Sequence, residues 1–213
     1  MNEKIPCMLP GEIEKRSFAI LTEELGQIAI PPEHEAVVKR VIHTTADFDY
    51  ARTLCFSPGA VAEGVRALRE GAHIVTDTQM ARAGVSARTL QGLGGAVHCF
   101  MGDEDVAEKA KARGVTRAAV SMEKAAELKF PLILAVGNAP TALIRLSELI
   151  EEGKISPRLI IGVPVGFVNV VESKEIIMNT GVPYIVARGR KGGSGVAAAV
   201  CNALLYEASG RTL

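Results

Sequence analysis

From residue 72 onward, short apolar runs alternate with helical stretches, and glycine or proline marks most of the turns between them. The runs are uninterrupted, which is typical of strands covered on both faces, and the stretches between them have the spacing of amphipathic helices. This alternation predicts an α/β fold of three layers, with helices on both faces of a mainly parallel sheet. The apolar runs are AHIVT, AVHCF, PLILAVG, PRLIIGVPVG and VPYIVA.

RTLCF at residues 52–56 is a further apolar run, which brings the expected sheet to about six strands. Residues 10–47 form an α-helical segment before it, with Pro31-Pro32 at a favourable start for its second helix. A chain of 213 residues suffices for one large α/β domain or two small ones. Because no linker, repeat or low-complexity tract divides the sequence, we expect a single domain over residues 1–213.

Composition argues against several functions. The 24 basic and 24 acidic residues cancel, which disfavours a general nucleic-acid surface. The N-terminal residues have no apolar signal core, and no apolar run approaches the roughly 18 residues of a membrane span. Cys7, Cys55, Cys99 and Cys201 form no CxxC pair, which fits free thiols in a reducing compartment. We therefore expect a cytoplasmic protein that binds neither nucleic acid nor membranes.

The loop ARGRKGGSG follows the last predicted strand, at the edge where open α/β sheets bind ligands. Its backbone amides precede a helix, whose dipole favours an anion, and Arg188, Arg190 and Lys191 add positive charge. The loop therefore indicates a cradle for carboxylate or phosphate groups, with a turn of solvated charges as the alternative. The small residues that complete the cradle are Gly192, Gly193 and Ser194.

GSGVAA at residues 193–198 matches GxGxxA, which is a weak dinucleotide signal. Such a site also needs an acidic residue about 20 positions further along, after a second strand. Only 15 residues follow Ala198 in this sequence, so we expect no nucleotide cofactor.

Other loops at the same edge also carry polar side chains. Asn138 and Thr141 begin the helix after the strand at 131–137, where they either cap the helix or contact a ligand. Asp77 follows the strand at 72–76, and its alternatives are a helix cap, a metal ligand or a substrate contact. Capping is favoured because no second carboxylate lies at metal-ligand spacing. Lys174, in VESKE, is interpreted as a surface charge.

His43 in RVIHTTADFDY falls almost opposite the apolar face of its own helix, so core burial within that helix does not require it. Asp47, four residues further along, could hydrogen-bond the ring and raise the pKa of His43. A protonated imidazole held against a ligand is a general acid, and an ordinary exposed or core histidine is the alternative. The apolar residues of this helix are Val37, Val38, Val41 and Ile42.

The other histidines, His34, His73 and His98, are interpreted as structural. None of them pairs with a second histidine or a cysteine at zinc-ligand spacing, and adjacent residues of a strand point to opposite faces. We therefore expect no protein-bound metal.

Several distinctive strings run from about residue 10 to residue 208. They are IEKRSFAIL, RVIHTTADFDY, HIVTDTQMARAG, GNAPTAL, IGVPVGFVNVVESKE and ARGRKGGSGVAAAVCNAL. Together they resemble the family of precorrin-8X methylmutases and their cobalt-pathway counterparts, the cobalt-precorrin-8 methylmutases. VPVGFVNVVESKE and RGRKGGSGVAAA are long and idiosyncratic, which makes the resemblance specific.

The resemblance implies an isomerase of cobalamin biosynthesis that moves a methyl group from C11 to C12 of the corrinoid ring. The product would be hydrogenobyrinate from precorrin-8X, or cobyrinate from cobalt-precorrin-8, and the cobalt series is mildly preferred. No redox cofactor, nucleotide or methyl donor is implied, and any cobalt belongs to the substrate. The catalytic histidine of the family matches His43, as a general acid or hydrogen-bond donor. Family members form homodimers with the active site at the subunit interface.

The acetate and propionate arms of such a substrate would account for the cationic loop. The substrate-binding residues expected on this basis are Ser17, Asp77, Arg117, Asn138, Thr141, Arg188, Lys191, Gly192, Gly193 and Ser194. A tightly held product could pass directly to a neighbouring pathway enzyme. The alternatives are a corrinoid carrier without turnover and, less favoured, an α/β isomerase of phosphosugars that uses the loop from Arg188 to Ser194.

Overall fold

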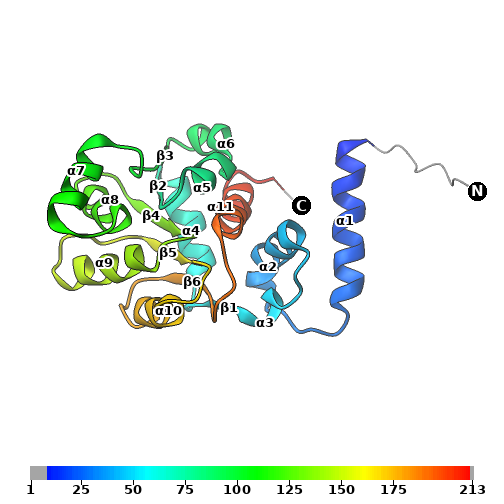
Figure 1. Ribbon diagram of the computed structural model, residues 1–213. Helices are drawn as coiled ribbons and strands as arrows, with labels where there is room; N and C mark the ends of the chain where they lie inside the picture. Colours follow the sequence, from blue (N-terminus) through cyan, green and yellow to red (C-terminus); the bar gives the residue numbers. More distant parts are fainter. Residues whose placement is uncertain (1–8, 212–213) are drawn as a thin grey trace, which may run out of the picture.

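The computed structural model describes residues 9–211, in which one six-stranded sheet forms the centre of the molecule (Figure 1). The strand order is β1-β6-β5-β4-β2-β3, with β1 antiparallel to β6 and all other neighbours parallel. The strands are β1 (Leu54–Phe56), β2 (His73–Thr76), β3 (Val97–His98), β4 (Leu132–Val136), β5 (Leu159–Gly162) and β6 (Tyr184–Ala187). The prediction of a mainly parallel sheet is confirmed, and β1 is its antiparallel exception.

Helices cover both faces of this sheet, as three layers require (Figure 1). On one side lie α2 (Pro32–Thr45), α4 (Ala60–Arg69), α5 (Gln79–Gly84), α6 (Ala87–Gly92) and α11 (Ser194–Ala208). On the other lie α7 (Glu104–Arg113), α8 (Arg117–Ala126), α9 (Pro140–Glu151) and α10 (Val170–Met178). The short α3 (Tyr50–Thr53) leads into β1.

Alternating side chains of the buried strands supply two separate cores. In β4, Ile133 and Ala135 belong to the core beneath α4 and α11, whereas Leu132, Leu134 and Val136 belong to the core beneath α8 and α9. A strand that is buried on both faces must be apolar throughout, which explains the uninterrupted runs in the sequence. The single domain over residues 1–213 stays a prediction.

The predicted N-terminal helical segment is confirmed as α1 (Pro10–Leu25) and α2, with Pro32 in the first turn of α2. Leu21 and Leu25 of α1 are buried in the same core as Val37 and Val41 of α2. α1 is the outermost helix on this side of the molecule (Figure 1). α2 packs chiefly on α11, so the α1–α2 corner lies outside the layer of helices that covers the sheet.

The chain direction across the sheet reverses between β2 and β4, because β3 lies to one side of them and β5 and β6 to the other. Such a switch point opens a crevice at the carboxyl ends of the strands. The loops after β2 and β4 therefore meet at the edge where the sequence predicts a ligand site.

Two expectations about the whole chain are answered only for the described residues. Across residues 9–211, no helix is both long enough and apolar enough to cross a membrane. Cys55, Cys99 and Cys201 are free thiols, whereas Cys7 lies outside the described residues.

Candidate active site

His43 is exposed on α2 and faces α1 across a small hollow of about 190 Å³. Its Nδ1 lies 2.9 Å from the hydroxyl oxygen of Ser17 on α1, and its ring stacks on Phe18 with the centroids 4.9 Å apart. No other hydrogen bond to the ring is present among the described residues, so Nε2 is the nitrogen left for a ligand. The structure thus brings the predicted residues Ser17 and His43 together.

The predicted bond between Asp47 and His43 is wrong. α2 ends at Thr45, and Ala46 adopts a left-handed conformation with φ of 53°, so the helical register does not continue to Asp47. Asp47 instead accepts a hydrogen bond of 2.6 Å from Lys191, which also donates to Asp49. The ammonium of Lys191 lowers the pKa of Asp47 below its usual range. The end of α2 is therefore tied to the loop after β6.

A buried arginine fixes α1 beside His43. Nη1 of Arg40 donates to Glu14 of α1 over 2.8 Å, and its guanidinium lies 4.9 Å from the Phe18 ring centroid and 5.1 Å from that of Tyr206. Arg40 is only 8% exposed, and this hydrogen bond lowers the pKa of Glu14. Because Arg40 and His43 are one helical turn apart, the same part of α1 that binds Arg40 also presents Ser17 to the imidazole.

Asp77 is fully buried at the carboxyl end of β2 and braces the loop after β4. Its carboxylate accepts hydrogen bonds from the backbone amides of Gly137, Asn138 and Ala139 at 2.7–2.8 Å. Burial raises the pKa of Asp77, although the amide donors oppose this shift. The carboxylate of Asp77 is not exposed, so a substrate could reach it only if the surrounding loops moved. The substrate role of Asp77 stays a prediction.

The capping interpretations are corrected in detail. Thr78, rather than Asp77, caps α5 by accepting from the amide of Ala81. α9 begins after Ala139 with no side-chain cap, so Asn138 does not cap it. The side chain of Asn138 is exposed and makes no hydrogen bond within the described part of the chain, which leaves it available to a ligand.

The glycine-rich loop between β6 and α11 packs closely against its neighbours. A Cβ atom on Gly137 would lie 2.8 Å from the carbonyl oxygen of Gly193, and one on Gly192 would collide with the carbonyl of Val163. The hydroxyl groups of Ser194 and Thr78 lie 2.7 Å apart. Only glycine permits the close contacts at Gly137 and Gly192. Together with the contact between Ser194 and Thr78, they bring the loops after β2, β4, β5 and β6 into one rim.

The cations of the β6–α11 loop are less available than the sequence suggests. Arg188 donates to Glu175 over 3.0 Å, and Lys191 is paired with Asp47 and Asp49. Arg190 has no carboxylate partner among residues 9–211 and lies over the Phe167 ring, 5.5 Å from its centroid. Exposed ion pairs contribute only about 0–1 kcal/mol each, so a substrate carboxylate can replace these partners.

Arg117 and Thr141 lie at the starts of α8 and α9, where they form a second part of the rim. Arg117 is exposed and makes no hydrogen bond or ion pair within residues 9–211. The Thr141 hydroxyl lies 2.8 Å from that of Thr116 and lines a hollow of about 570 Å³. This hollow is separate from the one at His43, so the described chain does not enclose all the predicted residues in a single cavity.

The interpretation of Lys174 as a surface charge is wrong, since its side chain is fully buried. Its ammonium donates to the carbonyl oxygens of Gly189 and Lys191 over 2.7 and 2.9 Å. A signal for this burial exists in the sequence. Val170, Ser173, Lys174 and Ile177 are spaced i, i+3, i+4 and i+7, which places the lysine on the inner face of its helix.

His73 and His98, on neighbouring strands, form a contact that the sequence does not reveal. His73 Nδ1 and His98 Nε2 lie 2.8 Å apart, and the His73 ring also stacks on Phe130. Burial lowers the pKa of both histidines. Within residues 9–211, no group of three or more potential metal ligands is found.

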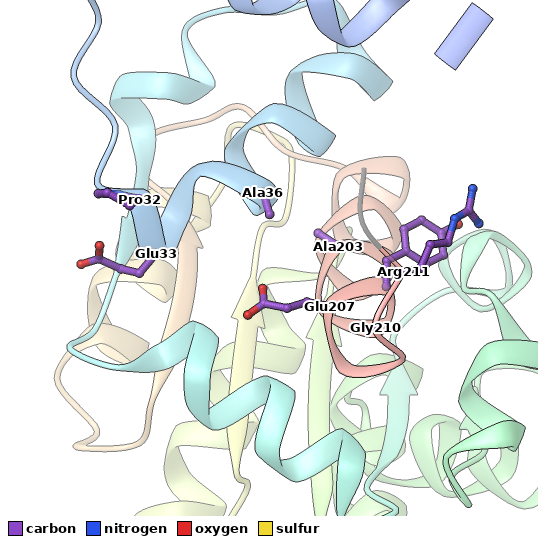
Figure 2. Close-up of a pocket in the computed structure, with 8 residues that line it drawn as sticks. Pro32, Glu33, Ala36, Ala203, Glu207, Gly210 and Arg211 are labelled. Carbon is purple, nitrogen blue, oxygen red and sulfur yellow. The ribbon is translucent and has the colours of Figure 1, made fainter. Parts of the chain in front are cut away.

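A third hollow, of about 380 Å³, lies between the start of α2 and the end of α11 (Figure 2). Figure 2 shows Glu33 at the start of α2 and Glu207 on α11, with the guanidinium of Arg211 pointing away from both carboxylates. None of the predicted site residues lines this hollow, so the candidate site is placed at His43 and the rim.

Comparison with known proteins identifies the family of this chain. Residues 12–207 match the CbiC family of precorrin-8X methylmutases. The chain belongs to this family. It is therefore an isomerase, and the family carries out a methyl shift in cobalamin biosynthesis.

Two curated cobalt-precorrin-8 methylmutases are 45% identical to the chain. The match to the protein from Priestia megaterium covers 92% of this chain and 87% of the relative, and the match to that from Salmonella typhimurium covers 92% and 95%. A crystal structure of precorrin-8x methyl mutase from Thermus thermophilus superimposes with a TM-score of 0.85 at 40% identity, over 94% of this chain and 99% of that one. The predicted fold and family are thus confirmed.

Proposed function

We propose that this methylmutase converts cobalt-precorrin-8 into cobyrinate by moving a methyl group from C11 to C12 of the ring. The observation that supports it most directly is the placement of His43, held by Ser17 and Phe18 on the polar side of α2 in a chain of this family. The preference for the cobalt series rests on the names of relatives such as those from Priestia megaterium and Salmonella typhimurium.

His43 acts in this proposal as a general acid or hydrogen-bond donor to the conjugated ring. Ser17 occupies Nδ1 and fixes the ring plane, so Nε2 faces the substrate. A positive or hydrogen-bonding group at that position draws electron density from the ring as the methyl group migrates. The methyl group leaves one carbon and joins another of the same molecule, so the step requires no redox cofactor or external methyl donor.

The rim holds the carboxylate arms of the substrate. Arg117 and Arg190 are the cations of the candidate site without a carboxylate partner among residues 9–211, and a guanidinium can bind a carboxylate through two hydrogen bonds. The loop amides at Gly192 and Gly193 and the exposed side chain of Asn138 add neutral donors. Lys191 and Arg188 join them when substrate arms replace Asp47 and Glu175.

The active site is completed by a second copy of the chain. The hollow at His43, about 190 Å³, is smaller than the roughly 300–1,000 Å³ of typical ligand pockets, and a corrinoid is a large ligand. Leu9, Ile13 and Ile20 expose 69%, 53% and 46% of their surface along one side of α1, next to Ser17. An exposed apolar stripe of this kind is typical of an interface. A homodimer would cover the stripe and enclose the hollow.

The dimer is tested by sedimentation of Ile13→Asp. A charge in the stripe should convert the dimer into a monomer and abolish turnover, whereas Lys15→Asp, on another side of α1, should leave the mass unchanged. A wild-type protein that sediments as a monomer contradicts this part of the proposal.

Cytoplasmic location and direct transfer of product to the next enzyme belong to the same proposal.

The reaction is tested with purified protein, cobalt-precorrin-8 and precorrin-8X in separate incubations. The methyl shift changes ring conjugation, so catalytic amounts of enzyme should change the absorption spectrum of the substrate completely. A spectral change that stops at one equivalent of protein would support a corrinoid carrier instead. Turnover of only the metal-free substrate would assign the protein to the precorrin-8X series.

A further inference from the structure

Lys174 is a buried charge for which the proposed reaction has no direct use. It lies on the inner face of α10 with 0% of its surface exposed, between Val170 and Ile177, which are also buried. No carboxylate lies within ion-pair distance of its ammonium among residues 9–211, and burial lowers the pKa of Lys174 to about 8. A buried ammonium without a counter-charge costs free energy that a methionine of similar length would not.

The ammonium of Lys174 donates its hydrogen bonds to the backbone of the β6–α11 loop. It donates to the carbonyl oxygens of Gly189 and Lys191, on either side of Arg190. Two carbonyl groups that point inward to the same ammonium fix the peptide units between them. The Arg190 side chain, which is exposed, is therefore held on the outer side of this segment.

The same segment is connected to both parts of the candidate site. The side chain of Lys191 reaches Asp47 at the end of the His43 helix, while its carbonyl oxygen is held by Lys174. Further along, the amide of Gly193 donates to Val163 over 2.8 Å, next to Ser194 at the rim. Lys174 thus holds the part of the loop that joins the end of α2, through Lys191, to Gly192 and Gly193 at the rim.

We propose that Lys174 is a positioning residue, whose buried ammonium holds the β6–α11 loop in the shape that presents Arg190 and the glycine amides to the substrate carboxylates. This inference rests on the proposed function and adds a residue that does not touch the substrate. Because His43 is bound by Ser17 rather than by this loop, Lys174 acts on substrate binding and leaves the chemical step intact.

The test compares Lys174→Met with Ser173→Ala. Ser173 is the adjacent residue, is equally buried and donates only to Val170 of its own helix, so its loss disturbs α10 without touching the loop. With cobalt-precorrin-8 as substrate, Lys174→Met should raise KM at least tenfold and change kcat by less than twofold. Ser173→Ala should change both by less than twofold. Amide hydrogen exchange at residues 189–193 should accelerate in Lys174→Met alone.

An unchanged KM together with unchanged exchange in a folded Lys174→Met protein would overturn the inference. If that variant does not fold, Lys174→Gln, whose side-chain amide is a neutral N–H donor, is measured in the same way and should show a smaller rise in KM. Failure of the proposed function has a different signature, since the wild type would then turn over neither corrinoid. In that case, exchange at residues 189–193 still decides whether Lys174 positions the loop.

Discussion

At the α1–α2 corner, an exposed imidazole is held by one hydroxyl group and one aromatic ring, whereas at the carboxyl edge of the sheet, buried side chains hold the backbone itself. Ser17 and Phe18 can be replaced without emptying a core. Replacing Asp77 or Lys174 instead leaves main-chain groups without their hydrogen-bond partners. In the proposed mechanism, the chemistry belongs to the α1–α2 corner and substrate binding to the carboxyl edge of the sheet, so variants should affect one without the other.

The largest effect expected is that of His43→Ala. Loss of the imidazole should reduce kcat about 10²- to 10⁴-fold, the usual contribution of general acid catalysis. Corrinoid affinity should persist, and because the exposed ring makes a single hydrogen bond, the free energy of unfolding should fall by no more than about 1.5 kcal/mol. Absorbance assays and urea denaturation measure the two quantities. Normal turnover by this variant would remove His43 from the mechanism.

Asp77→Ala should instead destabilise the carboxyl edge of the sheet. The amides of Gly137, Asn138 and Ala139 would lose their acceptor, and unsatisfied buried donors cost about 1–3 kcal/mol each. With partial relaxation, we expect the free energy of unfolding to fall by about 3 kcal/mol. Asp49→Ala, which removes an exposed carboxylate, should cost less than about 1 kcal/mol. Urea denaturation measures both variants. An equal decrease in the free energy of unfolding would show that the buried Asp77 stabilises the fold no more than the exposed Asp49.

Ser17→Ala tests whether Ser17 orients His43 at the α1–α2 corner. One hydrogen bond is worth about 0.5–1.5 kcal/mol, so a less well oriented imidazole should lower kcat roughly three- to tenfold. Thr22→Ala is the matched control, because the hydroxyl of Thr22 bonds only to its own helix. A drop in substrate affinity without a change in kcat would place Ser17 in binding rather than in orientation.

The smallest effect concerns the link between the two regions. Lys191 lowers the pKa of Asp47 in the folded protein, so this pair stabilises the fold above the ordinary aspartate pKa of about 3.9 and loses its effect as pH falls through the lower folded value. Asp47→Asn should therefore cost less than about 1 kcal/mol at pH 7, and the cost should be smaller at pH 2. Urea denaturation at both pH values checks the sign, and a cost that grows on acidification would contradict it.

The sheet could be predicted from the sequence because its four inner strands, β2, β4, β5 and β6, are largely buried and read as continuous apolar runs. RTLCF and the five later runs contain all six strands, although nothing in RTLCF signals that β1 runs antiparallel to β6. The loops at the carboxyl edge could likewise be placed, since the rule for parallel sheets assigns them one edge. Ser17 and His43 were matched through the family resemblance, and their contact requires the packing of α1 on α2.

Other features depend on contacts that local sequence does not encode. Ala46 is left-handed although glycine or asparagine usually fills such a position, so the break between His43 and Asp47 carries no signal. The pair of His73 and His98 depends on β2 lying beside β3, which only the strand order determines. The burial of Lys174, by contrast, is encoded locally, because its spacing along α10 places it on the buried face. Its charge nevertheless favours the interpretation of a surface residue.

Both margins of the sheet are very short. β1 has three residues and β3 has two, so neither offers the length of unpaired backbone that another chain needs in order to add a strand. Copies of this protein are thus poorly suited to joining edge to edge into a continuous sheet or a fibre. Any association between copies should therefore use helix and loop surfaces rather than backbone hydrogen bonds along a sheet edge.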